Sequence, residues 1–163
     1  YVGDAQPDLT FGWQNNFTWK NWDFSFFFRG TIGNKVLNNP RAAYANNTYL
    51  IGTNALDDEL TYTMKESSRV CSYYLENGSF IRLDNLALGY TFDTKKINWL
   101  DKARLYFAAQ NLFVITGYKG LDPEVELFRG ESSDTDAGLS PGIEPRQFFP
   151  KARTFTLGVN LTF

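Results

Sequence analysis

The chain has 163 residues and carries 16 Lys and Arg against 18 Asp and Glu, so its formal net charge is −2. This length fits one domain or part of one, and the charge balance excludes the basic surface that nucleic-acid binding requires. The absence of His and the presence of one cysteine, Cys71, exclude His-dependent catalysis, His metal ligands, internal disulfides and cysteine-rich metal sites within this chain.

Two strands open the predicted sheet, over residues 9–19 and 22–32. Each alternates apolar and polar residues with the period of two that a strand requires. Lys20 and Asn21 form the short turn between them. The apolar faces carry Leu9, Phe11, Trp13, Phe17, Trp19, Trp22, Phe24, Phe26, Phe28 and Ile32. Aromatic residues make up 17% of the chain although its mean hydropathy is −0.35, as expected when aromatic and polar residues interleave.

Three further strands are predicted over residues 80–92, 103–113 and 153–163. In the strand 80–92 the apolar residues switch from odd to even positions, which would place them on opposite faces. A β-bulge near residues 84–85 would return them to one face. Residues 111–112 interrupt the alternation of the next strand and have no clear place in it. The last strand alternates most regularly.

The connections between the predicted strands alternate in length. Short connections cover residues 20–21 and 93–102, and long ones cover residues 33–79 and 114–152. Alternating short turns and long loops is typical of transmembrane β-barrels. A strand of about 11 residues is about 36 Å long at about 3.3 Å per residue, and a tilt of about 45° makes it cover about 25 Å, the height of the apolar band of such barrels.

The polar faces of the strands also favour a membrane barrel. Gln14, Ser25, Arg29, Arg104 and Asn160 would be costly in a dry core, whereas a water-filled lumen accepts them. Because five strands cannot close a barrel, the sequence predicts an all-β chain that is part of a larger transmembrane antiparallel β-barrel. The alternative is a soluble β-sandwich that binds glycan through its aromatic residues.

Aromatic residues gather at one predicted end of the strands, where girdles of such residues mark a membrane interface. They flank the two short connections and close the chain. These residues are Trp19, Trp22, Phe92, Trp99 and Phe163. The pattern predicts that the short turns and the C-terminus are periplasmic and that the two long loops are extracellular.

Several stretches resemble the C-terminal end of SusC/RagA-type TonB-dependent outer-membrane transporters. These are SFIRLDNLALGYTF at 79–92, ARLYFAAQNLFVITGYKGLDPEV at 103–125 and PKARTFTLGVNLTF at 150–163, and residues 8–38 look like the preceding hairpin. The resemblance covers nearly the whole chain, except that residues 40–73 have no match.

The resemblance implies a barrel of 22 strands, a size known for outer-membrane transporters, of which this chain would supply the last five. It also implies the outer membrane of a Gram-negative cell, an N-terminal plug and energy supply through TonB. The plug would lie outside this chain, whose start at Tyr1 fits a segment internal to a longer precursor. A SusD-like surface lipoprotein would act as the lid, and the cargo would be an oligosaccharide or an oligopeptide. Neither an enzymatic activity nor a cofactor is implied, and a TonB-dependent siderophore or cobalamin receptor is the alternative transporter.

Candidate ligand contacts lie in the two long loops. Exposed tyrosines can stack on sugar rings or anchor a protein interface, and the turn GYKGLDPEV at 117–125 carries charged residues. The candidates are Tyr44, Tyr49, Tyr62, Lys119, Asp122 and Glu124. Packing within the loops, or a solvated turn, is the alternative role for these residues.

The last strand resembles the signal that the outer-membrane assembly machinery reads. Its apolar members are Phe155, Leu157, Val159, Leu161 and Phe163. The same residues would face lipid, so the two roles are compatible.

Two further sets of charged residues have structural interpretations. Arg29, Arg82 and Arg104 are expected to line the lumen and to pair with carboxylates of the barrel or the plug. The acidic stretch 126–136 is rich in oxygen ligands, as calcium loops are, but its spacing matches no defined loop and favours a solvated charge run.

Overall fold

The computed structural model describes residues 2–45, 52, 54, 56–57, 72–94, 99–125, 141–146 and 149–163. The chain divides into two compact units. The sheet unit comprises Thr10–Gly30, Ile81–Ile115 and Lys151–Phe163, and the loop unit comprises Tyr1–Leu9, Thr31–Phe80 and Thr116–Pro150.

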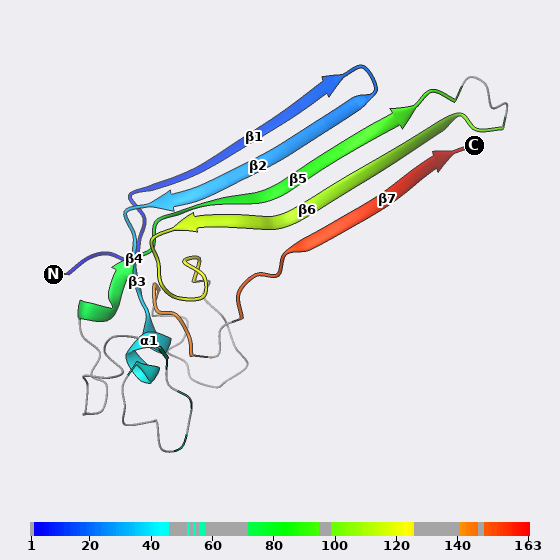
Figure 1. Cartoon of the computed structure of the whole chain (residues 1–163). Coiled ribbons are helices and arrows are strands. Elements are labelled where there is room, and N and C mark those ends of the chain that lie inside the picture. Colours follow the sequence, from blue (N-terminus) through cyan, green and yellow to red (C-terminus); the bar gives the residue numbers. More distant parts are fainter. Residues whose placement is uncertain are drawn as a thin grey trace. The chain divides into compact units, whose positions relative to one another are not determined.

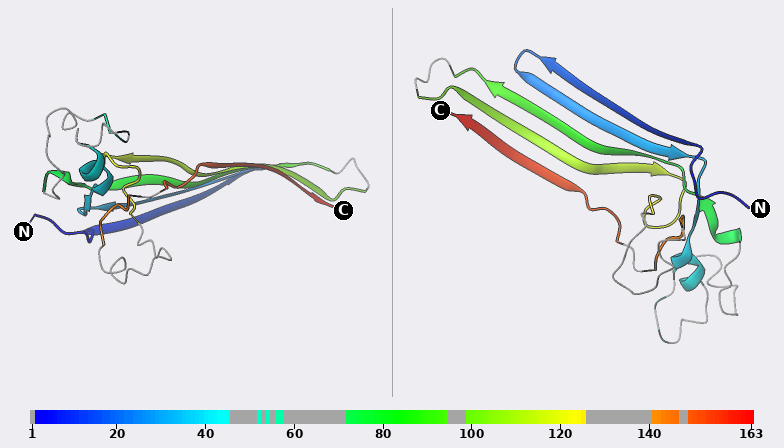
Figure 2. Two further views of the ribbon diagram at one scale, coloured as in Figure 1. Left: turned by 90° about the horizontal axis from the view of Figure 1, so that it is seen from below. Right: turned by 180° about the vertical axis from the view of Figure 1, so that it is seen from behind.

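Five strands form one sheet in the order β1-β2-β5-β6-β7 (Figure 1). Their bounds are β1 (Leu9–Trp19), β2 (Trp22–Ile32), β5 (Phe80–Phe92), β6 (Lys102–Thr116) and β7 (Thr154–Thr162). Neighbouring strands alternate in direction, and Figure 2 shows them as a single twisted layer, as expected for a sheet of L-residues. The predicted all-β, antiparallel architecture is confirmed.

The strand β6 differs most from its predicted range. It continues to Thr116 instead of ending at residue 113. The chain stays in the strand past the interruption because Asn111 adopts a left-handed conformation with φ of 52°, which Asn tolerates better than most residues. Its side-chain amide donates to the carbonyl of Lys151 at 2.6 Å and so ties β6 to the segment before β7.

A change of parity lies in β5 between Asp84 and Gly89. Asp84 pairs with Arg29 of β2 at 3.2 Å, and a Cβ added to Gly89 would meet the carboxylate of Asp23 of β2. Positions 23 and 29 differ by an even number and share a face of β2, whereas positions 84 and 89 differ by an odd number. One extra residue between them accounts for this, as the sequence predicts near residues 84–85.

Lys20 and Asn21 form a two-residue turn between β1 and β2. Lys20 has a positive φ of 53°, as the tight turns of hairpins require, and its ammonium lies 5.1 Å from the centre of the Trp19 ring. The side-chain amide of Asn21 donates to the carbonyl of Thr91 at 2.7 Å, which joins this turn to β5.

Aromatic rings cover one face of the first two strands. Trp13 packs edge-on against Phe26 with ring centres 5.2 Å apart, and Phe17 stacks on Phe24 at 6.2 Å. These cross-strand pairs fix the register of the hairpin.

The same face continues as an exposed apolar row on β7. Phe155, Leu157, Val159 and Leu161 each leave between 48% and 73% of their surface uncovered. Such a contiguous apolar surface is unfavourable in water and marks contact with lipid or protein. The residues therefore do not fill a closed, dry core, which argues against the soluble β-sandwich.

The opposite face carries ion pairs that reach across strands. Arg104 of β6 makes two contacts with Asp23 of β2, at 2.5 and 3.0 Å, and Arg29 of β2 pairs with Asp84 of β5. The expectation that Arg29 and Arg104 pair with carboxylates of the barrel wall is thus confirmed. Arg82 is almost fully buried and donates to the side-chain oxygen of Asn111.

The loop unit contains short regular elements inside the predicted loop 33–79. They are β3 (Lys35–Leu37), α1 (Asn39–Tyr44), the 3-10 helix η2 (Ser72–Tyr74) and β4 (Leu75–Asn77). β3 and β4 pair antiparallel, and Leu37 also forms a parallel bridge with Ile143 from the second long loop. Among the residues that the structure describes, no helix is long and apolar enough to cross a membrane.

Candidate functional site

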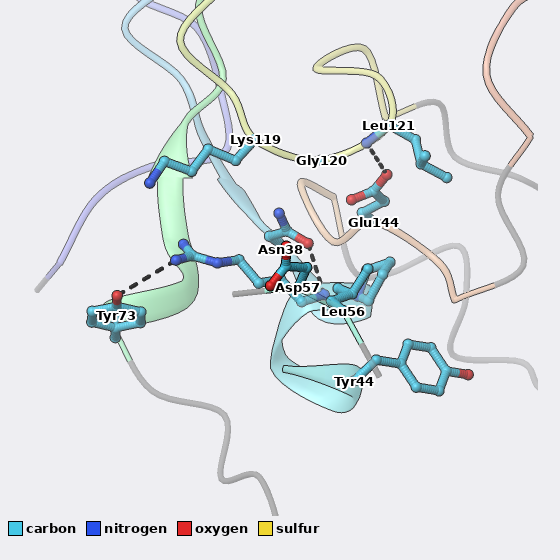
Figure 3. Close-up of a pocket in the computed structure, with 11 residues that line it drawn as sticks. Asn38, Tyr44, Leu56, Asp57, Tyr73, Lys119, Gly120, Leu121 and Glu144 are labelled. Carbon is cyan, nitrogen blue, oxygen red and sulfur yellow. Dashed lines mark hydrogen bonds between the residues drawn. The ribbon is translucent and has the colours of Figure 1, made fainter. Parts of the chain in front are cut away.

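A cavity of about 600 Å³ lies in the loop unit (Figure 3). Its lining comes from both long loops of the sequence prediction. The lining residues are Asn38, Pro40, Arg41, Tyr44, Leu56, Asp57, Tyr73, Lys119, Gly120, Leu121 and Glu144. A volume of about 300–1,000 Å³ is usual for small-molecule sites.

The short helix α1 presents Arg41 to the cavity. Asn38 caps the helix, because its side-chain oxygen accepts from the main-chain N–H of Arg41 at 2.9 Å. Pro40 stands in the first turn, where its fixed φ suits a helix and its missing N–H is not needed. The sequence therefore begins a helix at this point, and Arg41 is buried within it, with 8% of its surface exposed.

Glu76 of β4 joins the two loops at the cavity. One of its oxygens accepts from Nη1 of Arg41 at 2.9 Å and from the side-chain amide of Asn38 at 3.3 Å. The other accepts from the main-chain N–H of Lys119 at 2.8 Å. Because the side chains of Arg41 and Glu76 are each only 10% exposed, this pair is held away from solvent, and removing either partner alone would strand a buried charge.

Tyr73 completes this side of the cavity. Nη2 of Arg41 donates to its hydroxyl at 3.4 Å, and the guanidinium lies 5.2 Å from the centre of its ring. Figure 3 shows Tyr73 and Lys119 on one side of the cavity and Tyr44 on another.

Glu144 is the buried carboxyl group of the site, with no exposed surface. It accepts from the Tyr118 hydroxyl at 2.6 Å and from the main-chain N–H of Leu121 at 3.0 Å, and its own N–H donates to Leu37 at 3.0 Å. Burial raises the pKa of the Glu144 carboxyl, against these hydrogen bonds, and burial likewise raises the pKa of Tyr118. Glu144 thus ties three segments that are distant in the sequence.

The structure places the predicted ligand residues in different surroundings. Tyr44 and Lys119 line the cavity, and Glu124 lines a separate one of about 230 Å³. Asp122 is buried and accepts from the main-chain N–H of Glu124 at 2.9 Å, so it shapes the turn. Tyr49 and Tyr62 lie outside the described residues, as do Cys71 and the acidic stretch 126–136.

Sequence reasoning missed three charged residues of the site, namely Arg41, Glu76 and Glu144. The Asn-Asn-Pro start of α1 was a signal for a helix cap near Arg41. Nothing local to Glu76 or Glu144 distinguishes them, because their roles come from partners far along the chain.

The sequences of several TonB-dependent receptors match nearly the whole length of the chain. It is 34% identical to TonB-dependent receptor P3 of Formosa agariphila, over 99% of this chain and 17% of that protein. It is 31% identical to TonB-dependent receptor SusC of Bacteroides thetaiotaomicron, over 96% of this chain and 15% of that protein. No family model matches the chain.

Solved structures also match the chain over nearly its whole length. The RagAB peptide importer in its 'closed-closed' state superposes with a TM-score of 0.73 at 25% identity, over 98% of this chain and 18% of that chain. In the 'open-open' state the TM-score is 0.73 at 26% identity. The chain therefore spans less than a fifth of the length of the relatives it matches.

The chain forms an antiparallel sheet with one exposed apolar face, and almost its whole length matches part of these TonB-dependent receptors. The matches to SusC and to RagAB point to one type of such receptors. The chain is therefore similar to a segment of the SusC/RagA-type TonB-dependent transporters.

Proposed function

We propose that the chain supplies wall strands and two extracellular loops to a TonB-dependent outer-membrane importer of oligosaccharides or oligopeptides. It carries out no covalent reaction and needs no cofactor in this role. Its strands help to close the barrel, and its loops face the cargo and a SusD-like surface lipoprotein that acts as the lid.

The match to SusC and RagAB over at least 96% of the chain carries this proposal. The exposed apolar row of β7 supports it, because such a row is stable against lipid and a liability in water. Matches to SusC and to a peptide importer favour an oligomeric cargo over a siderophore or cobalamin.

We further propose that these are the last five of 22 strands, with the C-terminus and the short turns in the periplasm. The aromatic residues support this orientation. Trp22 contacts Tyr90 with ring centres 4.7 Å apart, and Trp99 stacks on Phe163 at 5.9 Å. Figure 1 shows the turn after β1 and the C-terminus at the same end of the sheet, as an interfacial girdle requires. The remaining strands, the plug and the contact with TonB lie outside this chain.

The function is tested by deleting the gene of the intact receptor in its host and restoring it in cells with and without functional TonB. The cells are expected to lose uptake of one class of oligosaccharide or oligopeptide, and the restored gene is expected to act only when TonB is functional. Recovery of the receptor without detergent, or uptake that ignores TonB, would contradict the proposal.

A further inference from the structure

Cationic residues gather at one corner of the loop-unit cavity. Glu76 binds the guanidinium of Arg41 at 2.9 Å and the main chain of Lys119 at 2.8 Å, so one carboxylate positions both residues. The Tyr73 hydroxyl is held there by Arg41. We call Arg41, Tyr73 and Lys119 the cationic corner.

The charge of Glu76 is balanced within this corner. Arg41 and Glu76 form a close pair, and both side chains are nine-tenths buried. Lys119 contacts Glu76 through its main-chain N–H, and the residue is exposed. Figure 3 draws the Lys119 side chain on the same side of the cavity as Tyr73, so its ammonium adds a positive charge there, while Arg41 already compensates the carboxylate of Glu76.

The rest of the lining combines an apolar surface with the polar side chains of Asn38, Asp57 and Glu144. Pro40, Leu56 and Leu121 line the cavity together with the ring of Tyr44, and Asp57 lies beside Leu56 (Figure 3). A sugar chain needs a polar partner for each buried hydroxyl. The carboxyl-terminal end of a peptide needs a positive charge for its carboxylate and an apolar surface for its last side chain. It also needs an acceptor, such as Asp57, for a main-chain N–H of the peptide.

We propose that this cavity binds the carboxyl-terminal end of an oligopeptide, with the carboxylate at the cationic corner and the last side chain against Leu56 and Leu121. The inference rests on the proposed import function and chooses between its two classes of cargo. Lys119 supplies the charge and is held by Glu76, and Tyr73 supplies a hydroxyl donor and is held by Arg41.

Calorimetry on the intact receptor, purified in detergent, tests the proposal with trileucine and with its carboxyl-terminal amide. The amide is expected to bind at least about tenfold more weakly, as is typical when a charged hydrogen-bond partner is lost. Lys119→Met is expected to weaken trileucine binding about tenfold and Lys119→Arg to restore most of it. Lys102→Met, at an exposed lysine that does not line the cavity, is expected to change nothing.

Equal binding of trileucine and its amide would overturn the proposal, as would binding that is insensitive to Lys119→Met. Preference for trigalacturonate, which carries carboxylates on a sugar chain, would overturn it too. A receptor that binds no peptide yet takes up an oligosaccharide through TonB would overturn this inference and leave the proposed function intact. A receptor that binds trileucine but shows no TonB-dependent uptake would overturn the proposed function and leave the peptide-binding cavity intact.

Discussion

Gly89 of β5 lies under the ion pair between Asp23 of β2 and Arg104 of β6. A Cβ at this position would fall within 2.6 Å of the Asp23 carboxylate and would also meet the guanidinium. The pair crosses an entire strand, and only a residue without a side chain leaves room for it. Glycine is therefore required here because it has no side chain, and not for its backbone conformation, since its φ is not in the left-handed region.

Gly89→Ala is expected to displace this ion pair and to lower the stability of the barrel by about 1 kcal/mol, the usual size for a partly exposed pair. The measurement is the temperature at which the intact receptor loses its folded, fast-migrating form on a detergent gel. Gly117→Ala is the matched control, because a Cβ there meets nothing within 4 Å. Equal effects of the two substitutions would contradict the assigned role.

Glu144 is expected to make the stability of the loop unit depend on pH. Because burial raises the pKa of its carboxyl, the folded unit holds a proton that the unfolded segment has already released, so stability is expected to fall as the pH rises from the ordinary carboxyl value through the raised one. Hydrogen exchange of the main chain at Leu121, corrected for intrinsic rates, is expected to speed up as the pH rises above the ordinary carboxyl value.

Glu144→Gln keeps an oxygen for the Leu121 N–H but cannot ionise, so it is expected to remove most of this pH dependence. Asp4→Asn, at an exposed carboxyl outside the cavity, serves as the control. A pH dependence that survives Glu144→Gln unchanged would show that another group is responsible.

At the scale of elements, β7 is the strand whose sequence specifies its environment most directly. Leu157 is 73% exposed on the apolar face, and its neighbour Thr156 points to the opposite face. Leu157→Lys is expected to cost about 2–4 kcal/mol if the strand lies near the bilayer midplane, and to reduce the folded fraction of the receptor in outer-membrane preparations. Thr156→Lys is expected to cost much less, and equal losses would contradict a lipid-facing row.

The long strands could be predicted because the face of the sheet on which a side chain lies follows from the position of its residue along the strand. A period of two over 11 residues gives β1 and β2 their ranges, and the parity change in β5 is visible in the sequence. The end of β6 could not be found in this way, since the strand continues through the left-handed Asn111, whose amide bonds to Lys151, a partner far along the chain.

The loop unit could be predicted only in part, for a different physical reason. Its short elements have no periodicity of their own and are held by contacts between distant segments, such as Glu76 with Lys119 and Glu144 with Tyr118. The turn of residues 117–125 was recognisable from its glycines and proline, whereas the partners that turn it into one wall of a cavity were not.

At the scale of the whole molecule, the proposed orientation predicts which positions are reachable from outside the cell. With Cys71 replaced by Ser, a cysteine at exposed Gly52 in the loop unit is expected to react with a membrane-impermeant maleimide on intact cells. A cysteine at Asn21, in the short turn, is expected to react only after the outer membrane is opened. The reverse pattern would place the C-terminus outside the cell.

The most direct test of the membrane account is the accessibility of nitroxide side chains placed one by one at residues 155–161 of the intact receptor in lipid bilayers. The account predicts that labels at Phe155, Leu157, Val159 and Leu161 collide preferentially with oxygen dissolved in lipid. Labels at the alternate positions are expected to collide preferentially with a water-soluble nickel complex. Uniform aqueous accessibility along the strand, or no alternation with a period of two, would contradict it.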